Sequence, residues 1–242
     1  MAIHNPERTL VRDASAVRST VFLKILMAVS GFVFIGFVLG HMYGNLKAFQ
    51  GQEKFDEYAH HLRVLGEPML PHEGFLWIMR VGLILALIVH VYAAATLWKR
   101  AQRARTVKYQ VKKHTGAIFA SRLMRWGGVT LLLFLIWHLL EFTIVKVNVG
   151  DGATQIDGHD SPYLLLVSSF DVWWLTVIYL IAMLALGAHL HHGVWSATQT
   201  LGLTGSVRTR KLAKRTAFGL AVLISGGFSL VPLGVLLGII EK

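Results

Sequence analysis

Five long apolar segments alternate with polar connections along this chain. The segments cover residues 21–43, 75–98, 117–145, 172–195 and 216–240. A helix needs about 20 mostly apolar residues to cross the hydrocarbon core of a bilayer, and each segment is long enough. The pattern therefore predicts an all-α integral membrane protein with five transmembrane helices, in which residues 1–242 form a single membrane-anchor domain.

The composition supports lipid as the solvent of this protein. Hydrophobic residues make up 54% of the chain and charged residues only 15%, whereas soluble domains average about 25% charged residues. Residues 1–20 are polar and charged and lack the apolar run of a cleavable signal peptide, so we expect them to form a tail. The absence of cysteine excludes disulfides, thiolate-ligated or covalently attached haem and iron–sulfur clusters on this chain.

The basic residues predict the orientation of the helices. Eighteen of the 24 Lys and Arg residues lie on one side of the membrane if the N-terminus is cytoplasmic, and acidic residues dominate the opposite connections. By the positive-inside rule, the N-terminus is cytoplasmic and the C-terminus external. The net charge of +11 is then a topology signal, which predicts no nucleic-acid partner. The same surface is a candidate dock for a soluble partner.

Four apolar segments carry a histidine, and the depths of these histidines pair. His41 and His138 both fall in the external halves of their helices, whereas His90 and His189 fall in the cytoplasmic halves. At 1.5 Å per residue, the two levels are separated by roughly 15–20 Å. The fifth segment, residues 216–240, has no histidine. The pattern predicts a four-helix core that holds two histidine pairs, closed by a fifth packing helix.

Ionisable groups inside membrane helices are costly and usually functional, and two imidazoles from facing helices are suited to ligate one haem iron. Spacing alone leaves open that the histidines make structural polar contacts or line a proton or metal pathway. One ligand is also ambiguous, because His192 shares a helix face with His189. Depth favours His189 as the partner of His90, with His192 as the alternative.

Several motifs accompany these histidines in order along the chain. They are Lys24, Ser30-Gly31, His41-Met-Tyr-Gly-Asn45, Phe55-Asp-Glu-Tyr58, Leu-Trp77, Arg80, His90, Arg125, Trp137-His138-Leu-Leu-Glu141, and His189 followed by Gly193 and Trp195-Ser196. Over nearly its whole length the chain resembles the cytochrome b558 membrane anchor of succinate:quinone oxidoreductases (respiratory complex II), of the single-subunit, five-helix, di-haem type. The histidine four residues before a glycine resembles the axial-ligand pattern of that family, which also favours His189 over His192.

The resemblance implies a role in electron transport. Flavoprotein and iron–sulfur subunits of succinate dehydrogenase or fumarate reductase would exchange electrons with this anchor, whose two b-type haems would pass them to or from a quinone such as menaquinone. His90 and His189 would bind the proximal haem and His41 and His138 the distal haem. This chain alone would have no succinate chemistry. The resemblance further implies a bacterial cytoplasmic membrane, contact with membrane lipid and a complex that could form a higher oligomer.

Six further residues are candidates for the surroundings of the cofactors. Arg80, Arg125 and Ser30 could bind a haem propionate or a quinone, and Glu141, Glu67 and Trp195 could lie near the quinone. Plain alternatives exist: the arginines could anchor at the membrane surface, Glu67 could be a solvated loop residue, Trp195 could be an interfacial aromatic, and Glu141 could only cap or hydrogen-bond near the distal haem.

One position departs from the resemblance. Some di-haem fumarate reductases similar to this family carry a carboxylate two residues before the histidine that corresponds to His189, where this chain has Gly187, so a proton path on that residue does not carry over. Two rival functions remain open at this point. One is the cytochrome b subunit of another quinone-linked dehydrogenase, and the other is a haem-free quinone-binding anchor or transporter-like membrane protein.

Overall fold

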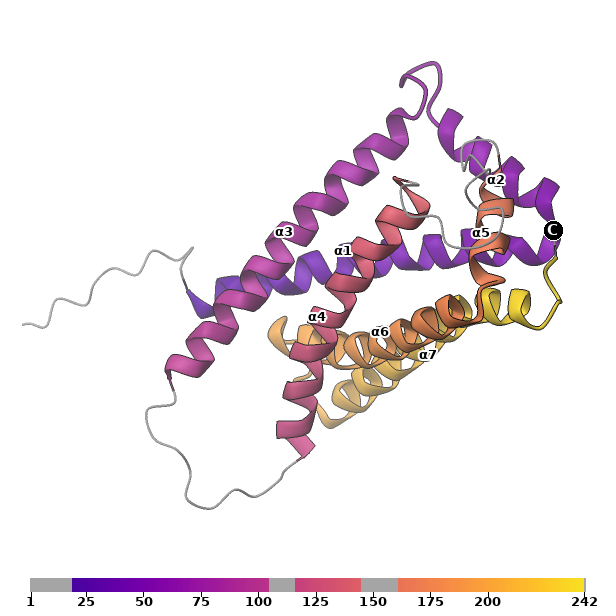
Figure 1. Cartoon of the computed structure of the whole chain (residues 1–242). Helices are drawn as coiled ribbons and strands as arrows, with labels where there is room; N and C mark the ends of the chain where they lie inside the picture. Colours follow the sequence, from indigo (N-terminus) through magenta and orange to yellow (C-terminus); the bar gives the residue numbers. More distant parts are fainter. Residues whose placement is uncertain (1–18, 105–115, 145–160, 242) are drawn as a thin grey trace, which may run out of the picture.

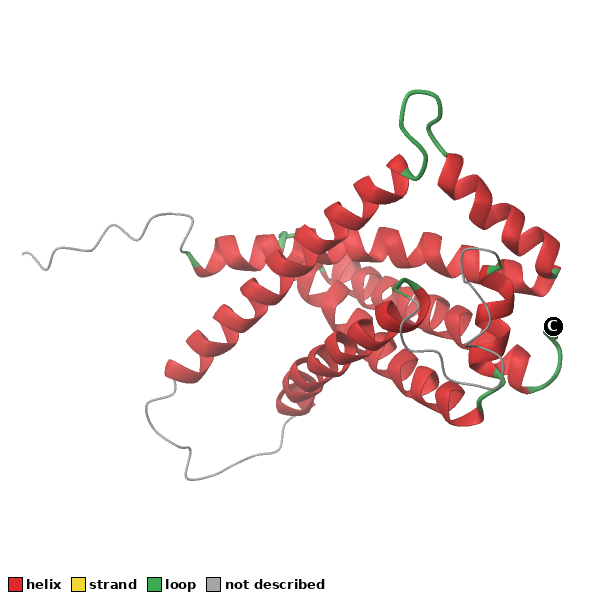
Figure 2. Cartoon of the chain, turned by 45° about the horizontal axis from the view of Figure 1, so that its top comes forward, coloured by secondary structure: helices red, strands yellow, loops and turns green. Residues whose placement is uncertain are grey.

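The computed structural model describes residues 19–104, 116–144 and 161–241, and for residues 116–122 the backbone alone (Figure 1). The described part contains helices and no strand (Figure 2). The elements are α1 (Thr20–Leu46), the 3-10 helix η2 (Lys47–Gln50), α2 (Gln52–Val64), α3 (Gly74–Arg103), α4 (Gly116–Phe142), α5 (Pro162–Phe170), α6 (Trp173–Thr200) and α7 (Val207–Leu236).

Five of these helices, namely α1, α3, α4, α6 and α7, are long and apolar enough to cross a membrane. Many of their large apolar side chains face outward; Ile88 on α3 is 60% exposed and Leu184 on α6 is 76% exposed. Lipid would cover such side chains in a bilayer, where helices satisfy their own backbone hydrogen bonds. The prediction of an all-α, multi-pass membrane protein with five spanning helices is confirmed.

The start of the last spanning helix was predicted too late. Helix α7 begins at Val207, nine residues before the predicted start at residue 216, and ends at Leu236. Ser206 and Thr209 form a reciprocal capping box, in which each side chain accepts a hydrogen bond from the other residue's backbone N–H, and this arrangement favours helix initiation. The basic residues predicted for a loop therefore lie on the first turns of α7, at Arg208, Arg210, Lys211, Lys214 and Arg215.

Two connections predicted as loops also contain helices. Gly51 has a φ of 88° and separates η2 from α2. Helix α5 begins with Pro162 at its first position, and the Ser161 side chain caps it. Asp56 on α2 then accepts hydrogen bonds from the Ser161 hydroxyl, at 2.7 Å, and from the Tyr163 backbone N–H, at 3.0 Å. These bonds hold α2, which lies between α1 and α3, against the start of α5, which lies between α4 and α6.

The molecule has two chemically different ends. We call the end that carries Arg100, Arg103 and the basic first turns of α7 the basic end, and the end that carries α2 and α5 the acidic end. Arg100 Nη1 donates to Thr20 Oγ1 at 3.1 Å, which joins the end of α3 to the start of α1. Lys214 Nζ lies 5.1 Å from the ring centre of Trp195, which joins the start of α7 to the last turns of α6. The helices therefore alternate in direction, as predicted.

Helices α6 and α7 pack against each other most extensively, and α1 packs on α3, α6 and α7, while α4 packs on α6. In contrast, α1 with α4 and α3 with α6 make few or no close backbone contacts in the described part of the chain. The largest buried cluster lies at the acidic end and includes Tyr163, Phe170, Tyr179, Val231 and Val235. The bundle is thus closely packed between α6 and α7, and less closely packed between α1 and α4 and between α3 and α6.

Gly187 is needed for the contact between α6 and α7. A Cβ atom at this position would lie 2.9 Å from Ser225 Oγ on α7, so α7 occupies the space that a side chain would need. We expect Gly187→Leu to destabilise the protein by about 1–3 kcal/mol, as overpacking does, and to lower the thermal unfolding midpoint in detergent. Gly219→Leu on α7 is the matched control, because nothing lies within 4 Å of its Cβ position. Equal midpoints for the two variants would contradict this account of the contact.

Candidate functional site

The structure brings the four histidines together as two pairs. The ring centres of His41 on α1 and His138 on α4 lie 5.8 Å apart, with an interplanar angle of 74°. Those of His90 on α3 and His189 on α6 lie 6.2 Å apart, with an angle of 54°. Two imidazoles that ligate one metal from opposite sides, with metal–nitrogen bonds of about 2 Å, have ring centres roughly 6 Å apart. Both separations therefore suit an ion between the rings.

The pairs lie at different levels of the bundle. Ser30 on α1 contacts His90 and precedes His41 by eleven residues, which corresponds to about 16 Å along a helix. On α4, the Cβ position of Gly128 lies 3.6 Å from His189, and Gly128 precedes His138 by ten residues, or about 15 Å. We call His90 with His189 the basic-end pair and His41 with His138 the acidic-end pair.

Ser30 orients one imidazole of the basic-end pair. Its hydroxyl donates to the Leu26 carbonyl at 2.7 Å, and its oxygen lies 3.0 Å from His90 Nδ1. A hydroxyl has one proton to donate, so the oxygen accepts from His90 Nδ1–H. This tautomer leaves the Nε2 lone pair available to a metal. On the opposite side, His189 Nδ1 is buried without a hydrogen-bond partner, which is unfavourable in an apolar interior unless a ligand compensates.

The acidic-end pair has a longer hydrogen-bond chain. Tyr179 on α6 donates its hydroxyl proton to Glu141 Oε2 at 2.6 Å, and its oxygen lies 3.3 Å from His138 Nδ1. Because the hydroxyl proton is already given to Glu141, the tyrosine oxygen accepts from His138 Nδ1–H. His138 therefore also has Nε2 available. The partner ring belongs to His41, whose Nε2 lies 3.5 Å from Asn45 Nδ2; this amide also donates to the His41 carbonyl at 2.8 Å.

Aromatic rings surround the acidic-end pair. Phe37 stacks on His41 with 5.3 Å between the ring centres, and Phe228 lies 5.6 Å from the same ring. Phe134 and Phe142 lie 5.9 Å and 5.4 Å from the ring centre of His138. At the basic-end pair, Phe34 meets His90 edge-on at 5.9 Å. These rings make an apolar surrounding that suits a flat hydrophobic macrocycle and excludes water.

The backbones are not closely packed at the two pairs. The helices joined by the histidine pairs, α1 with α4 and α3 with α6, are the ones that make few or no close backbone contacts in the described residues. Gly31 and Gly128 lie beside the imidazoles of His90 and His189, and the Cβ positions of Gly36 and Gly40 face open space. The described part contains no group of three or more His, Cys, Asp or Glu side chains placed for a metal. A haem needs only two axial ligands from the protein, and the pairs fit that requirement.

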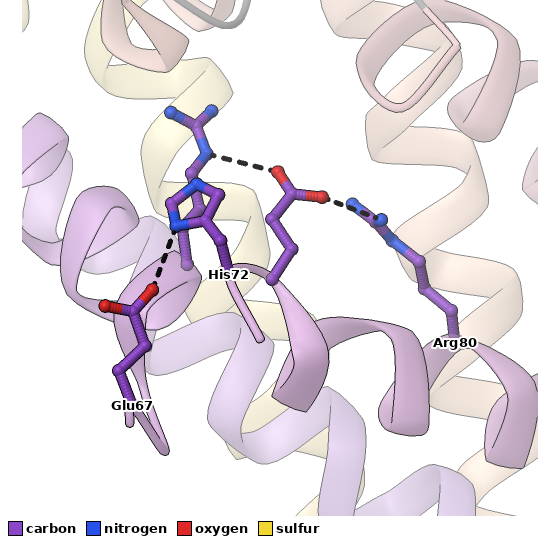
Figure 3. A network of polar contacts seen from close by, with 5 residues as sticks. Glu67, His72 and Arg80 are labelled. Carbon is purple, nitrogen blue, oxygen red and sulfur yellow. Dashed lines mark hydrogen bonds and ion pairs between the residues drawn. The ribbon is translucent and has the colours of Figure 1, made fainter. Parts of the chain in front are cut away.

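Arg80 takes part in a network at the acidic end (Figure 3). Its Nη1 lies 3.4 Å from Glu73 Oε2, and the second oxygen of Glu73 lies 3.9 Å from Arg63 Nε. The guanidinium of Arg80 also lies 5.0 Å from the Trp77 ring centre. Arg80 is therefore charge-paired and partly exposed at the edge of α3, so any contact with a propionate or quinone would be made in addition to Glu73.

Glu67 is exposed in the same region. Its Oε1 lies 3.1 Å from His72 Nδ1 within the connection between α2 and α3 (Figure 3). Pairs of exposed side chains such as this one contribute little to stability. The structure thus separates Glu67 from Glu141, the other acid predicted near a quinone, which is fully buried beside the acidic-end pair.

The remaining candidates lie towards the basic end. The guanidinium of Arg125 on α4 lies 5.9 Å from the ring centre of Trp98 on α3. The ammonium group of Lys214 lies over the ring of Trp195. On α6, His192 is half-buried and the ring of its exposed neighbour His191 meets Phe218. The structure pairs His90 with His189, which is the partner that depth favoured over His192.

A shallow cavity of about 440 Å³ lies on α2, and Lys47, Lys54, Glu57, Tyr58, His60 and His61 are among its lining residues. Lys54 donates to Glu57 at 2.8 Å. The hydrogen bond raises the pKa of Lys54 and lowers the pKa of Glu57, although both groups are fully exposed. Burial raises the pKa of Tyr58. This cavity is a polar surface feature of the acidic end and is lined by none of the four paired histidines.

Tyr179 is the residue that the sequence interpretation missed. It lies ten residues before His189 on α6, which is the spacing that separates the two levels on α4. A tyrosine at that spacing from one ligand was therefore a signal for a partner of the other pair.

The chain matches no protein-family model, no curated protein and no solved structure in comparisons with known proteins.

Proposed function

We propose that this chain is the cytochrome b membrane anchor of a succinate:quinone oxidoreductase and holds two b-type haems. The observation that supports this most directly is the pair of bis-imidazole sites, with ring centres 5.8 Å and 6.2 Å apart on four spanning helices. At each site, one histidine has its Nδ1 engaged by a hydroxyl oxygen, from Ser30 or from Tyr179. A hydrogen bond to the nitrogen that does not bind the metal orients a metal-ligating histidine.

The residues of the two sites have different proposed roles. His90 and His189 would hold the proximal haem, and His41 and His138 the distal haem. When bound, haem supplies a one-electron carrier at each level. Ser30 and Tyr179 fix the ring orientation of their histidines, and the phenylalanines around the acidic-end pair keep water away from it. The two levels lie about 16 Å apart along α1, so together they extend across much of the membrane.

The basic end is the proposed cytoplasmic side of a bacterial cytoplasmic membrane. It carries the exposed first turns of α7, including Arg208, Lys211 and Arg215. Basic residues are retained on the cytoplasmic side, and a positive surface attracts an acidic partner face. We therefore assign this end to the flavoprotein and iron–sulfur subunits, with the N-terminus on the same side and the C-terminus outside.

Quinone binding is proposed at the acidic end, next to the distal site. Quinone reduction needs a group that can supply or accept protons beside the carbonyls. Glu141 is buried and is linked to His138 through Tyr179, and Glu67 is exposed in the connection between α2 and α3. Trp195 would serve only a quinone bound at the opposite end. Menaquinone is the substrate implied by the resemblance.

The test is a dithionite-reduced minus oxidised spectrum of the purified protein, with pyridine-haemochrome quantification and identification of copurifying subunits. We expect two haems b per chain, together with a flavoprotein and an iron–sulfur protein that oxidise succinate. Two haems with the soluble subunits of a different dehydrogenase would keep the cytochrome and overturn the succinate assignment. Protein without haem, made under haem-replete conditions, would overturn the di-haem mechanism and leave a quinone anchor or a transporter.

A further inference from the structure

We infer that Tyr179 and Glu141 form a positioning dyad that sets the hydrogen bonding of His138 and thereby lowers the reduction potential of the distal haem. This inference rests on the proposed function, because it assumes a haem at the acidic-end pair. It assigns these two residues a role in tuning one redox centre, which differs from a role in binding quinone.

The geometry of the dyad is directional. Glu141 Oε2 accepts the Tyr179 hydroxyl proton at 2.6 Å, at the short end of the usual range for O–H···O bonds. The tyrosine oxygen is thereby polarised and becomes a better acceptor for His138 Nδ1–H at 3.3 Å. Hydrogen bonds in such chains strengthen one another in a low-dielectric interior.

The hydrogen bonds from His138 through Tyr179 to Glu141 are buried beside the acidic-end pair. Glu141 is fully buried, with 0% of its surface exposed, and Tyr179 is 5% exposed. Packing locks the tyrosine ring, which meets Phe134 and Phe170 edge-on with 4.9 Å between ring centres in each case. A carboxyl group in this position is expensive without a partner, and Tyr179 is the partner that the hydrogen bonding shows.

The basic-end pair offers a comparison. There His90 Nδ1 meets the Ser30 hydroxyl, which donates to a backbone carbonyl and has no carboxylate behind it. A stronger acceptor on Nδ1–H makes the imidazole a better electron donor to the metal. More electron donation favours the oxidised iron, so the dyad should lower the potential of the distal site.

The experiment measures the midpoint potential of each haem in the purified complex by redox titration, together with the low-temperature EPR signal of each oxidised haem. Tyr179→Phe keeps the packed ring and removes the hydroxyl. We expect both haems to remain and the distal potential to become more positive, with about a tenfold change in its oxidised-to-reduced ratio, which is 59 mV for one electron. Glu141→Gln retains an oxygen acceptor and should give a smaller shift in the same direction.

Two variants serve as controls. Tyr163→Phe makes the same change to a buried tyrosine that donates to the Glu241 carbonyl, and it should shift neither potential. Ser30→Ala should shift the proximal potential and leave the distal one unchanged. Loss of the distal haem in Tyr179→Phe would instead overturn the inference, because the dyad would then retain the haem rather than set its potential.

The outcomes separate the two proposals. Unchanged distal potential and EPR signal in Tyr179→Phe, with two haems present, would overturn the dyad and leave the proposed function intact. A wild-type protein without haem would overturn the proposed function and the dyad with it.

Discussion

His189→Ala is expected to leave one haem per chain, whereas His192→Ala is expected to leave two. The ring centre of His189 lies 6.2 Å from that of His90, and Gly128 on α4 lies beside the His189 ring. An alanine side chain cannot ligate iron, so the proposed proximal site would lose one of its two histidine ligands and, we expect, its haem. Pyridine-haemochrome quantification of the purified protein measures the number directly.

The companion variants distinguish loss of one site from general misfolding. His90→Ala should give the same spectrum as His189→Ala, because both remove the proximal haem and preserve the distal one. The double variant should therefore still contain one haem. If His192→Ala rather than His189→Ala removed a haem, the ligand assignment on α6 would shift by one turn, and the pairing of rings in the structure would not describe the loaded protein.

The number of spanning helices could be predicted because hydropathy depends on composition over some 20 residues and tolerates errors at the ends. Helix α7 shows where this fails. Its first turns are basic and resemble a loop by hydropathy, and its true start depends on the local hydrogen bonds between Ser206 and Thr209. Likewise, α2 and α5 are held together through Asp56 and Ser161, which are far apart in the sequence.

The two histidine pairs could be predicted because helical rise converts sequence position into depth, and only matching depths can meet across a bundle. Depth says nothing about rotation around each helix axis. Tyr179 meets His138 because α4 and α6 pack in one particular rotation. Arg80 forms an ion pair with Glu73, because Glu73 adopts a left-handed backbone conformation, with a φ of 59°, just before α3. The sequence therefore did not predict the contact of Tyr179 with His138 or that of Glu73 with Arg80.

The positions of the two sites lead to a prediction about electron transfer. Under the proposed function, His138→Ala should remove the distal haem and lower succinate:quinone oxidoreduction at least about 100-fold, because loss of a group that only hydrogen-bonds a metal ligand already costs about 10–100-fold in activity. Reduction of a soluble dye by the flavoprotein and iron–sulfur subunits of the same complex should be unchanged. Steady-state assays with both acceptors on one purified preparation measure the two rates.

The rates of quinone reduction in variants of His138 and His41 test at which end quinone binds. His41→Ala is the matched variant on α1, and it should reproduce the effect because it empties the same site. If either variant lacked the distal haem yet reduced quinone at the wild-type rate, quinone would have to receive electrons at the basic end. Trp195 would then be the candidate contact, and the acidic end with Glu141 and Glu67 would have no part in quinone chemistry. Loss of quinone reduction with retained dye reduction would instead support electron transfer from the basic-end pair to the acidic-end pair before quinone.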